Sequence, residues 1–322
     1  MSVMKPQAMR DAFLERIHGA MATDETIFFV SADFGSPVLD RIRADFGRRF
    51  VNVGIAEQNL INVSAGLALE GYKVFAYAIA PFITMRCFEQ IRVSLALLSQ
   101  VRPMNVNLIG VGAGYSYVVS GPTHQCYEDL TIMRALPAVR ILSPSDHRLA
   151  DALFDHCVDT VGPKYLRFDA QVLPVAHEEG APDLAKGFRS LREGDGICLL
   201  ATGFMAHTAL AAAAELAAEG IEVAVLDLFS ITHFDENALK RVLDGYRGVV
   251  TLEEGFRARG GVDALLFDFL ARTGCKTRMR NIGVDPGYRF ELGTRAELHE
   301  QVSIGVHAVV SQVRDFVRWI DD

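Results

Sequence analysis

The order of apolar and polar positions predicts a chain in which helices and strands alternate. Between residues 7 and 22, Met9, Phe13, Ile17 and Met21 recur at the spacing of one helix face. TIFFVSAD follows as a short buried strand that ends in a polar turn. The N-terminal half then continues with strands at RFVNVG, KVFAYAI, MNVNLIGVG and AVRILSPS, and with helices at QNLINVSAGLALEG, FEQIRVSLALLS and HRLADALFDHCV. This alternation favours parallel strand pairing and an α/β fold.

A break in the pattern near the middle divides the chain. Residues 169–190 are rich in Pro, Gly and unpatterned charge, which is typical of a linker. Beyond the break, strands are expected at ICLLATG, EVAVLDL, GVVTLEE and KTRMRNIGV, and helices at HTALAAAAELAAEG, ENALKRVLDGY, GVDALLFDFLART and from about residue 305. A length of 322 residues, half of them hydrophobic, is enough for two cores. We therefore predict two parallel-sheet α/β domains, at 1–168 and 191–322.

Composition and charge exclude several classes of protein. The net charge of -8 and the absence of a Lys/Arg-rich run argue against a nucleic-acid partner. No apolar stretch reaches the roughly 18 to 20 residues of a membrane span, so no membrane partner is expected. The five cysteines are widely spaced and form no C-x-x-C pair, so we expect neither a disulfide framework nor metal ligands in this chain. A cytoplasmic location fits best.

Glu57 is the first candidate for chemistry. It lies in VNVGIAEQN, where a predicted strand ends and a helix begins. Apolar surroundings disfavour a charged carboxylate, so such an acid can stay protonated and donate a hydrogen bond to a ring nitrogen. The alternative is an ordinary acidic residue in the first turn of a helix. The apolar neighbours in the sequence are Ile55, Ala56, Leu60 and Ile61.

Four ordered motifs give the chain a resemblance to a known family. They are GIAEQN, AGLALEGY, APFITMRCFEQIR and SGPTHQCYEDLTIMRALPAVRILSPSD. The series resembles the pyrimidine-binding and C-terminal domains of transketolases, from about residue 7 to the C-terminus. Deoxyxylulose-phosphate synthases share GIAEQ and THQ, and the beta subunits of 2-oxoacid dehydrogenases share the domain order. Neither typically has GPTHQ followed by ED and MR.

The resemblance implies a site for the cofactor thiamine diphosphate. Glu57 is then the glutamate that activates the aminopyrimidine ring. Phe82 and Phe88, with Met85 between them, stand where the family has aromatic residues around that ring, although plain core packing is the alternative. Asp33 ends a predicted strand and matches a family aspartate near the cofactor. Ligands of open α/β sheets bind at this edge, whereas a surface turn is the alternative reading.

The GPTHQ motif implies contacts with the substrate. In the family its histidine, here His124, faces the reacting sugar carbons. An imidazole can hydrogen-bond a hydroxyl group or carry its proton, while a solvated surface histidine is the alternative. Gln125 beside it is a second candidate.

Three departures from the family bear on the substrate. Transketolases that act on sugar phosphates typically have Asp before GPTH, a His further upstream, and Arg in an SRQN-like segment. This chain has Ser120, Gly112 and Ala170 there, with Arg167 nearby. Fewer charge-assisted bonds weaken phosphate recognition. We therefore expect a non-standard small-molecule substrate, with Ser120 and Arg167 as candidate contacts.

The half of the cofactor site that holds the diphosphate is missing from the sequence. Thiamine enzymes bind Mg²⁺ and the diphosphate through a GDG motif followed further along by Asn, which supplies oxygen ligands. The GDG at 194–196 has its next Asn only at Asn237, so we interpret it as a turn. The resemblance therefore implies that Mg²⁺ is held by a separate diphosphate-binding, N-terminal-type transketolase subunit, in an α2β2 heterotetramer.

These inferences predict an enzyme, a transferase active only with its partner subunit. It would transfer a two-carbon ketol unit from a ketose donor to an aldehyde or ketone acceptor. A 2-oxoacid-decarboxylating acyl or acyloin transferase, or a 2-oxoacid dehydrogenase beta-type subunit, is the enzymatic alternative. A non-catalytic scaffold subunit is the alternative from another class. A flavodoxin-like nucleotide module is disfavoured because no G-x-G-x-x-G follows the first strand.

Overall fold

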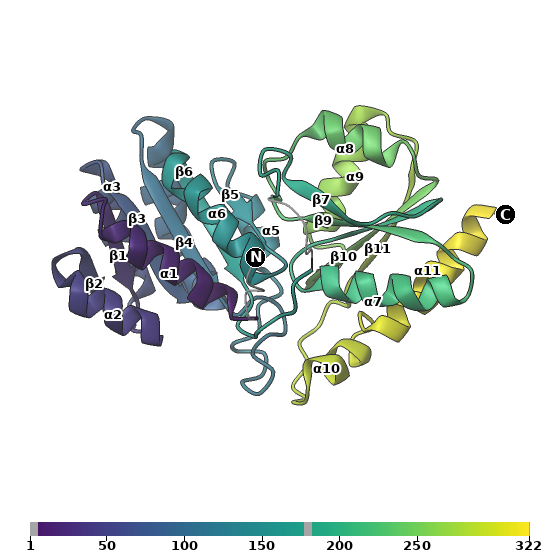
Figure 1. The fold of residues 1–322 in the computed structure, drawn as a ribbon, viewed down its shortest axis with the longest axis horizontal. Helices are drawn as coiled ribbons and strands as arrows, with labels where there is room; N and C mark the ends of the chain where they lie inside the picture. The colour runs from purple at the N-terminus through teal and green to yellow at the C-terminus, as the bar shows by residue number, and fades with distance from the viewer. Residues whose placement is uncertain (1–5, 177–181, 322) are drawn as a thin grey trace. The chain divides into compact units, whose positions relative to one another are not determined.

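The computed structural model describes residues 6–176 and 182–321, which form two compact units (Figure 1). The first unit runs up to Ala113 and includes Ile132–Val175. The second contains Gly114–Thr131 and the chain from Ala176 onward. Part of the expected linker, residues 177–181, lies outside the described residues. The limits 1–168, 169–190 and 191–322 therefore stay a prediction.

A parallel sheet of six strands forms the first unit, in the order β2-β1-β3-β4-β6-β5. Every residue of β4 is buried, as expected for a parallel strand covered on both faces. The sequence pattern did not predict β6, because Pro163, Lys164 and Arg167 interrupt its apolar run, yet all three are buried. The strands are β1 (Ile27–Ser31), β2 (Phe50–Asn52), β3 (Lys73–Ile79), β4 (Asn105–Val111), β5 (Arg140–Leu142) and β6 (Gly162–Phe168).

The helices before and between these strands follow the prediction in most places. One correction concerns FEQIRVSLALLS, expected as one α-helix but divided into a short α-helix, a π-helical segment and a final 3₁₀ turn. Another correction is α2, which was not predicted. Ser36 caps its first turn, because the Ser36 Oγ accepts a hydrogen bond from the Val38 N–H. The helices are α1 (Met9–Met21), α2 (Pro37–Asp45), α3 (Glu57–Leu69), α4 (Phe88–Gln90), α5 (Asp129–Arg134), α6 (His147–Asp159), the 3₁₀ turns η1 (Gly47–Arg49) and η4 (Leu98–Gln100), and the π-helical η2 (Phe82–Arg86) and η3 (Ile91–Leu97).

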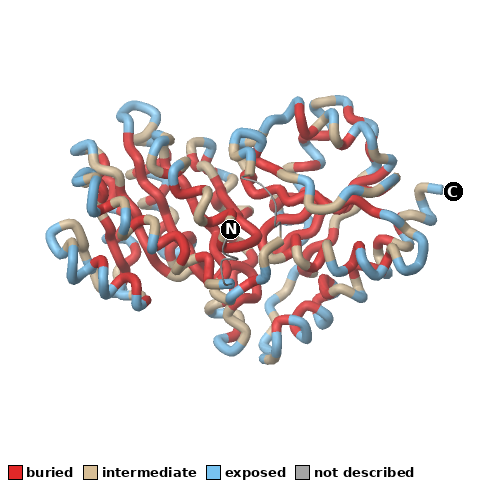
Figure 2. Tube along the Cα trace, in the orientation of Figure 1, coloured by how far each residue is buried: buried red, intermediate tan, exposed pale blue. Residues whose placement is uncertain are grey.

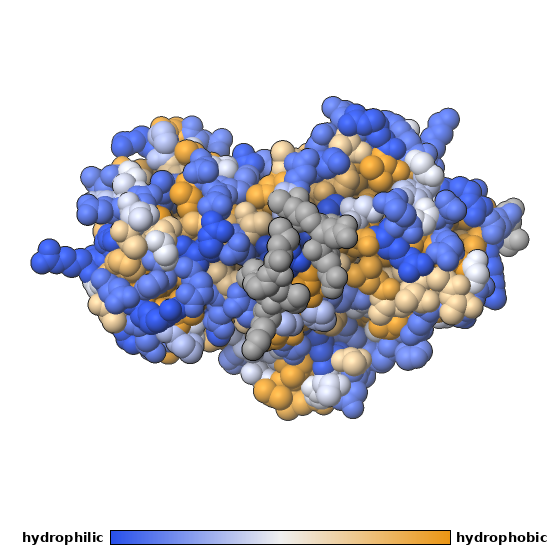
Figure 3. All heavy atoms as spheres, in the orientation of Figure 1, coloured by the Kyte–Doolittle hydropathy of each residue, from blue (hydrophilic) through white to orange (hydrophobic). Residues whose placement is uncertain are grey.

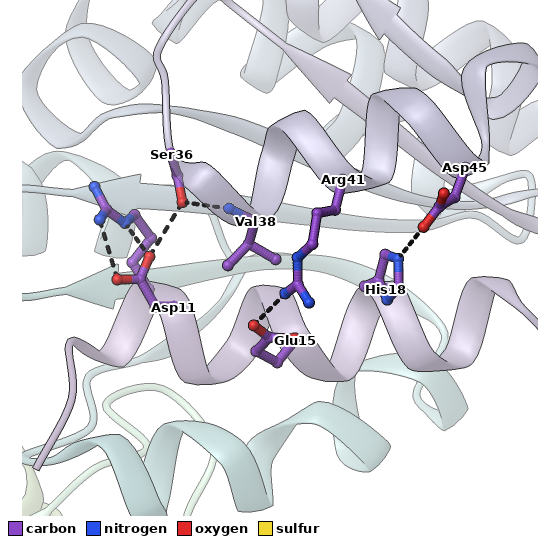
Figure 4. Close-up of polar contacts among 8 residues, drawn as sticks. Asp11, Glu15, His18, Ser36, Val38, Arg41 and Asp45 are labelled. Atoms are coloured by element: carbon purple, nitrogen blue, oxygen red, sulfur yellow. Dashed lines mark hydrogen bonds and ion pairs between the residues drawn. The ribbon is translucent and has the colours of Figure 1, made fainter. Parts of the chain in front are cut away.

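Polar contacts connect α1 to α2 along their length (Figure 4). Two of the three pairs are exposed to solvent, which screens them, so they orient α2 more than they stabilise it. The pairs are Asp11 with Ser36 at 3.1 Å, Glu15 with Arg41, and His18 with Asp45 at 2.8 Å.

The second unit has a five-stranded sheet in the order β11-β10-β8-β9-β7. Four strands are parallel, which confirms the predicted fold class, and edge strand β7 runs antiparallel to β9. The prediction missed β7, which begins inside the expected linker, and it missed α10. The elements are β7 (Phe188–Arg192), β8 (Ile197–Ala201), α7 (Met205–Ala218), β9 (Val223–Leu228), α8 (Glu236–Leu243), β10 (Gly248–Phe256), α9 (Val262–Thr273), β11 (Arg278–Val284), α10 (Arg295–Gln301) and α11 (Val306–Asp321).

The GDG sequence forms the bend between β7 and β8, as expected. A Cβ on Gly194 would lie 2.2 Å from the backbone of Val223. Gly196 has a φ of +69°, in the left-handed region that favours glycine. Both glycines therefore have a steric role in this bend.

Burial is concentrated in the strands of each sheet (Figure 2). Polar residues cover most of the face shown in Figure 3, with smaller apolar patches between them. Within residues 6–176 and 182–321, no helix combines the length and the hydrophobicity that crossing a membrane requires.

Candidate functional site

Glu57 is the first residue of α3, and only 5% of it is exposed. Of its expected apolar neighbours, Leu60 and Ile61 are fully buried, whereas Ile55 is 75% exposed. The carboxyl group therefore lies at the edge of the core, beside an open surface.

Arg86 is the charged neighbour of Glu57 that the sequence did not indicate. Its Nη1 donates to both carboxyl oxygens of Glu57, at 3.1 and 3.3 Å. The expectation of purely apolar surroundings was wrong, because a guanidinium cation contacts the carboxyl group directly. Arg86 lies four residues after Phe82, a spacing that brings those two side chains together but does not indicate the contact with Glu57.

The three candidate ring-binding residues lie in η2 and α4. The Arg86 guanidinium lies over the ring of half-buried Phe82, 3.9 Å from its centroid. Glu57, Arg86 and Phe82 therefore form one contiguous group. Met85 is 41% exposed and Phe88 is partly buried.

Asp33 lies just beyond the end of β1, next to the end of β2. It has a φ of +56°, which is uncommon for a residue other than glycine. Its carboxylate accepts from Asn52 at 2.8 Å, and Asn52 in turn accepts from the Gly54 N–H at 2.9 Å. Asp33, Asn52 and Arg43 line a cavity of about 170 Å³. The position agrees with ligand binding at the carboxyl edge of a parallel sheet.

The GPTHQ motif lies in a closed loop of the second unit. Gly114 and Cys126 exchange two backbone hydrogen bonds of 3.0 Å and close the base of the loop. The His124 N–H donates to the Gly121 carbonyl at 3.1 Å, and Thr123 Oγ1 lies 2.9 Å from His124 Nδ1. The imidazole is therefore oriented locally, in a different unit from Glu57.

The remaining substrate candidates differ in exposure. Gln125 is buried, and its Oε1 accepts from the Tyr127 hydroxyl. Ser120 is exposed, and its carbonyl accepts from Thr123 at 3.4 Å. Arg167 is buried on β6, beside Gly110 of β4. Of the three, Ser120 has the side chain most open to solvent.

A buried charged cluster, not indicated by the sequence, supports the base of this loop. Glu254 on β10 accepts from the Tyr115 N–H at 3.2 Å, from Arg295 at 2.6 Å and from His299 at 2.6 Å. Burial acts to raise the pKa of Glu254, but Arg295 and His299 outweigh it and hold that pKa well below its usual range. A Cβ on Gly114 would lie 2.3 Å from a Glu254 oxygen, so the loop base is fitted closely to this carboxylate.

Two protein-family models match the chain, one for each predicted domain. The transketolase pyrimidine-binding domain matches residues 5–175, and the transketolase C-terminal domain matches residues 187–309.

Two curated relatives resemble most of the chain, and each is one subunit of a transketolase. One is an apulose-4-phosphate transketolase subunit of Actinobacillus succinogenes, 32% identical over 83% of this chain and 84% of the relative. The other is the 6-deoxy-6-sulfo-D-fructose transketolase subunit SqwH of a Clostridium species, 30% identical over 94% of this chain and 92% of the relative.

Solved structures agree with these matches. A split-gene transketolase, described as an inactive β4 tetramer, is 28% identical with a TM-score of 0.83, over 96% of this chain and 98% of that one. The transketolase of Campylobacter jejuni shares the fold, with a TM-score of 0.81 at 21% identity over 97% of this chain and 47% of the longer one.

Proposed function

The chain belongs to the transketolase family, and on that premise we propose that it is one subunit of a split, thiamine diphosphate-dependent transketolase. The assembled enzyme would transfer a two-carbon ketol unit from a ketose donor to an aldehyde or ketone acceptor. Similarity to single subunits of two other transketolases supports the proposal. The observation that carries it is the buried Glu57 carboxyl group at the start of α3, which shares the Arg86 guanidinium with the Phe82 ring.

The residues around Glu57 fit an aminopyrimidine ring. A buried carboxyl group can hold a proton at a ring nitrogen, and an aromatic face can pack against a flat heterocycle. The planar guanidinium of Arg86 stacks on the Phe82 ring, 3.9 Å from its centroid. A flat group therefore fits on that face of the ring. When bound, thiamine diphosphate supplies the electron sink for breaking and forming carbon–carbon bonds.

Other residues of this chain have roles in orientation and recognition. We propose that Asp33 contributes to the cofactor site from the end of β1, and that Met85 and Phe88 complete its apolar wall. His124 would contact the hydroxyl groups of the substrate, with Gln125 as its support. Ser120 and Arg167 are the proposed determinants of a non-standard substrate.

The proposal requires a partner subunit for the charged end of the cofactor. A diphosphate-binding subunit would hold Mg²⁺ and the diphosphate in an α2β2 assembly in the cytoplasm. The relatives from Actinobacillus succinogenes and from the Clostridium species are each named as one subunit of a transketolase, which supports a partner of this kind.

Replacing Glu57 in the assembled pair tests the function. We expect Glu57→Gln to lower kcat about 100-fold or more, because proton transfer by a positioned side chain contributes about that much. Glu89→Gln is the matched control, since Glu89 is an exposed glutamate in α4. Turnover is measured with thiamine diphosphate, Mg²⁺ and a ketose donor. Unchanged turnover of Glu57→Gln would favour the scaffold alternative.

The choice of donor and acceptor separates the remaining alternatives. We expect xylulose 5-phosphate or a related ketose to act as donor, whereas turnover of pyruvate would favour the decarboxylating alternative. Ribose 5-phosphate should be a poor acceptor. Its acceptance as readily as by an ordinary transketolase would refute the non-standard substrate.

A further inference from the structure

We propose that Arg86 competes with the cofactor's aminopyrimidine ring for Glu57 and Phe82, and thereby sets the affinity of this site for thiamine diphosphate. The inference rests on the proposed function and adds to it a residue that determines cofactor affinity. It follows from contacts within η2 and α3 of the first unit.

Arg86 uses the two contacts that a flat, nitrogen-bearing ring needs here. Its Nη1 donates to both Glu57 oxygens at 3.1 and 3.3 Å, and its guanidinium lies 3.9 Å from the centroid of the Phe82 ring. A guanidinium is planar and delocalised, carries N–H donors in its plane, and stacks on aromatic faces. An aminopyrimidine has the same flat shape and also carries N–H donors. Both groups cannot occupy the same ring face and carboxyl group at once.

The burial of the partners indicates which side chain gives way. The side chain of Glu57 is 6% exposed and fixed at the start of α3, whereas that of Arg86 is 49% exposed. An ion pair with one half-exposed partner is screened by solvent and easily separated. Arg86 can therefore swing into solvent without repacking the core, and Glu57 stays in place.

This competition lowers the apparent affinity by a calculable factor. The apparent Kd equals the intrinsic Kd divided by the fraction of molecules in which the site is accessible. If Arg86 covers the site in about nine molecules of ten, its removal tightens Kd about tenfold. If Arg86 covers the site in about half of the molecules, the same relation gives a gain of only about twofold.

Calorimetric titration of thiamine diphosphate into the assembled pair, in Mg²⁺, tests the inference. We expect Arg86→Ala to tighten Kd about three- to tenfold. Arg86→Lys keeps the charge but loses the planar group, and we expect an intermediate Kd. Arg92→Ala is the matched control, because Arg92 is equally exposed and pairs with Glu89 at 3.7 Å, away from Glu57. Its Kd should stay within about twofold of the wild type.

A double-mutant cycle removes the competition in a second way. In Glu57→Gln the carboxylate that attracts Arg86 is gone, so adding Arg86→Ala should change Kd much less than it does in the wild type. A role of Arg86 in local packing would give the same change in both backgrounds.

The outcomes separate this inference from the proposed function. Unchanged or weaker binding by Arg86→Ala, with normal binding by the wild type, overturns the competition and leaves the function standing. A wild-type pair that binds no thiamine diphosphate overturns the proposed function, and the role of Arg86 falls with it.

Discussion

At the scale of single residues, Lys164 shows how far a buried charge can depend on neutral partners. It is fully buried on β6, and its Nζ donates to the Asn105 side chain at 3.0 Å and to the carbonyls of Gly162 at 2.8 Å and Thr160 at 2.5 Å. None of these three acceptors is a carboxylate. Burial lowers the pKa of Lys164 from 10.5 to about 8, because the charged form is poorly solvated there.

The depressed pKa predicts a specific dependence of stability on pH. Between pH 8 and 10.5 the unfolded chain binds more protons at Lys164, so this residue's contribution to stability rises with pH across that window. Below pH 8 its full penalty, on the order of 3 kcal/mol, applies. The Lys164→Met variant has no charge to bury at this position, so this pH-dependent contribution to the free energy of unfolding is absent. Urea unfolding of both proteins at pH 7 and pH 10 should show the wild type gaining relative to Lys164→Met at the higher pH. An equal difference at both pH values would contradict the assignment.

At the scale of elements, the loop that carries His124 depends on its fit to β10. Gly114 has a φ of +55°, and a Cβ there would lie within 2.7 Å of three Glu254 atoms. Glu254 also accepts a hydrogen bond from the Tyr115 N–H. The position of His124 therefore depends on a glycine at one end of the loop and a carboxylate on a distant strand.

We expect Gly114→Ala to destabilise the protein by about 1 to 3 kcal/mol, because it adds both backbone strain and overpacking. Gly66→Ala is the matched control in α3, where a Cβ meets nothing within 4 Å. There the change should stabilise the helix by about 0.5 to 1 kcal/mol. Chemical denaturation measures both, and hydrogen exchange of residues 114–126 should rise in Gly114→Ala alone. Equal effects at the two glycines would contradict the close fit to Glu254.

At the scale of the whole molecule, the second unit includes a segment that follows a strand of the first. Gly114–Thr131 comes after β4 in sequence and packs within the second unit. Tyr115 and Tyr127 of this segment are buried in that unit's core, together with Leu252 and Val284. The core of the second unit is therefore assembled from two stretches of sequence.

A fragment of residues 191–322, cut at the predicted boundary, should not fold cooperatively. It lacks Tyr115 and Tyr127, and the loss of a buried aromatic side chain costs about 3 to 5 kcal/mol. It also lacks the Tyr115 N–H, which donates a hydrogen bond to Glu254 in the whole chain. Near-UV circular dichroism and urea unfolding should show weak tertiary signal and a broad transition. A sharp transition like that of the whole chain would show that the segment is dispensable.

The sequence by itself determined the α/β class, most strands and helices, and the motifs from which the candidate residues were drawn. Those features follow from local periodicity, which encodes which face of an element is buried. Only the tertiary structure joined Glu57 to Arg86, 29 positions apart, and Tyr115 to Glu254, 139 positions apart. It also buried Lys164 and Arg167 in β6 and reversed β7 at the sheet edge. Such contacts depend on which helices and strands, far apart in the sequence, the order of the sheet brings together. The local pattern of side chains contains no information about that order.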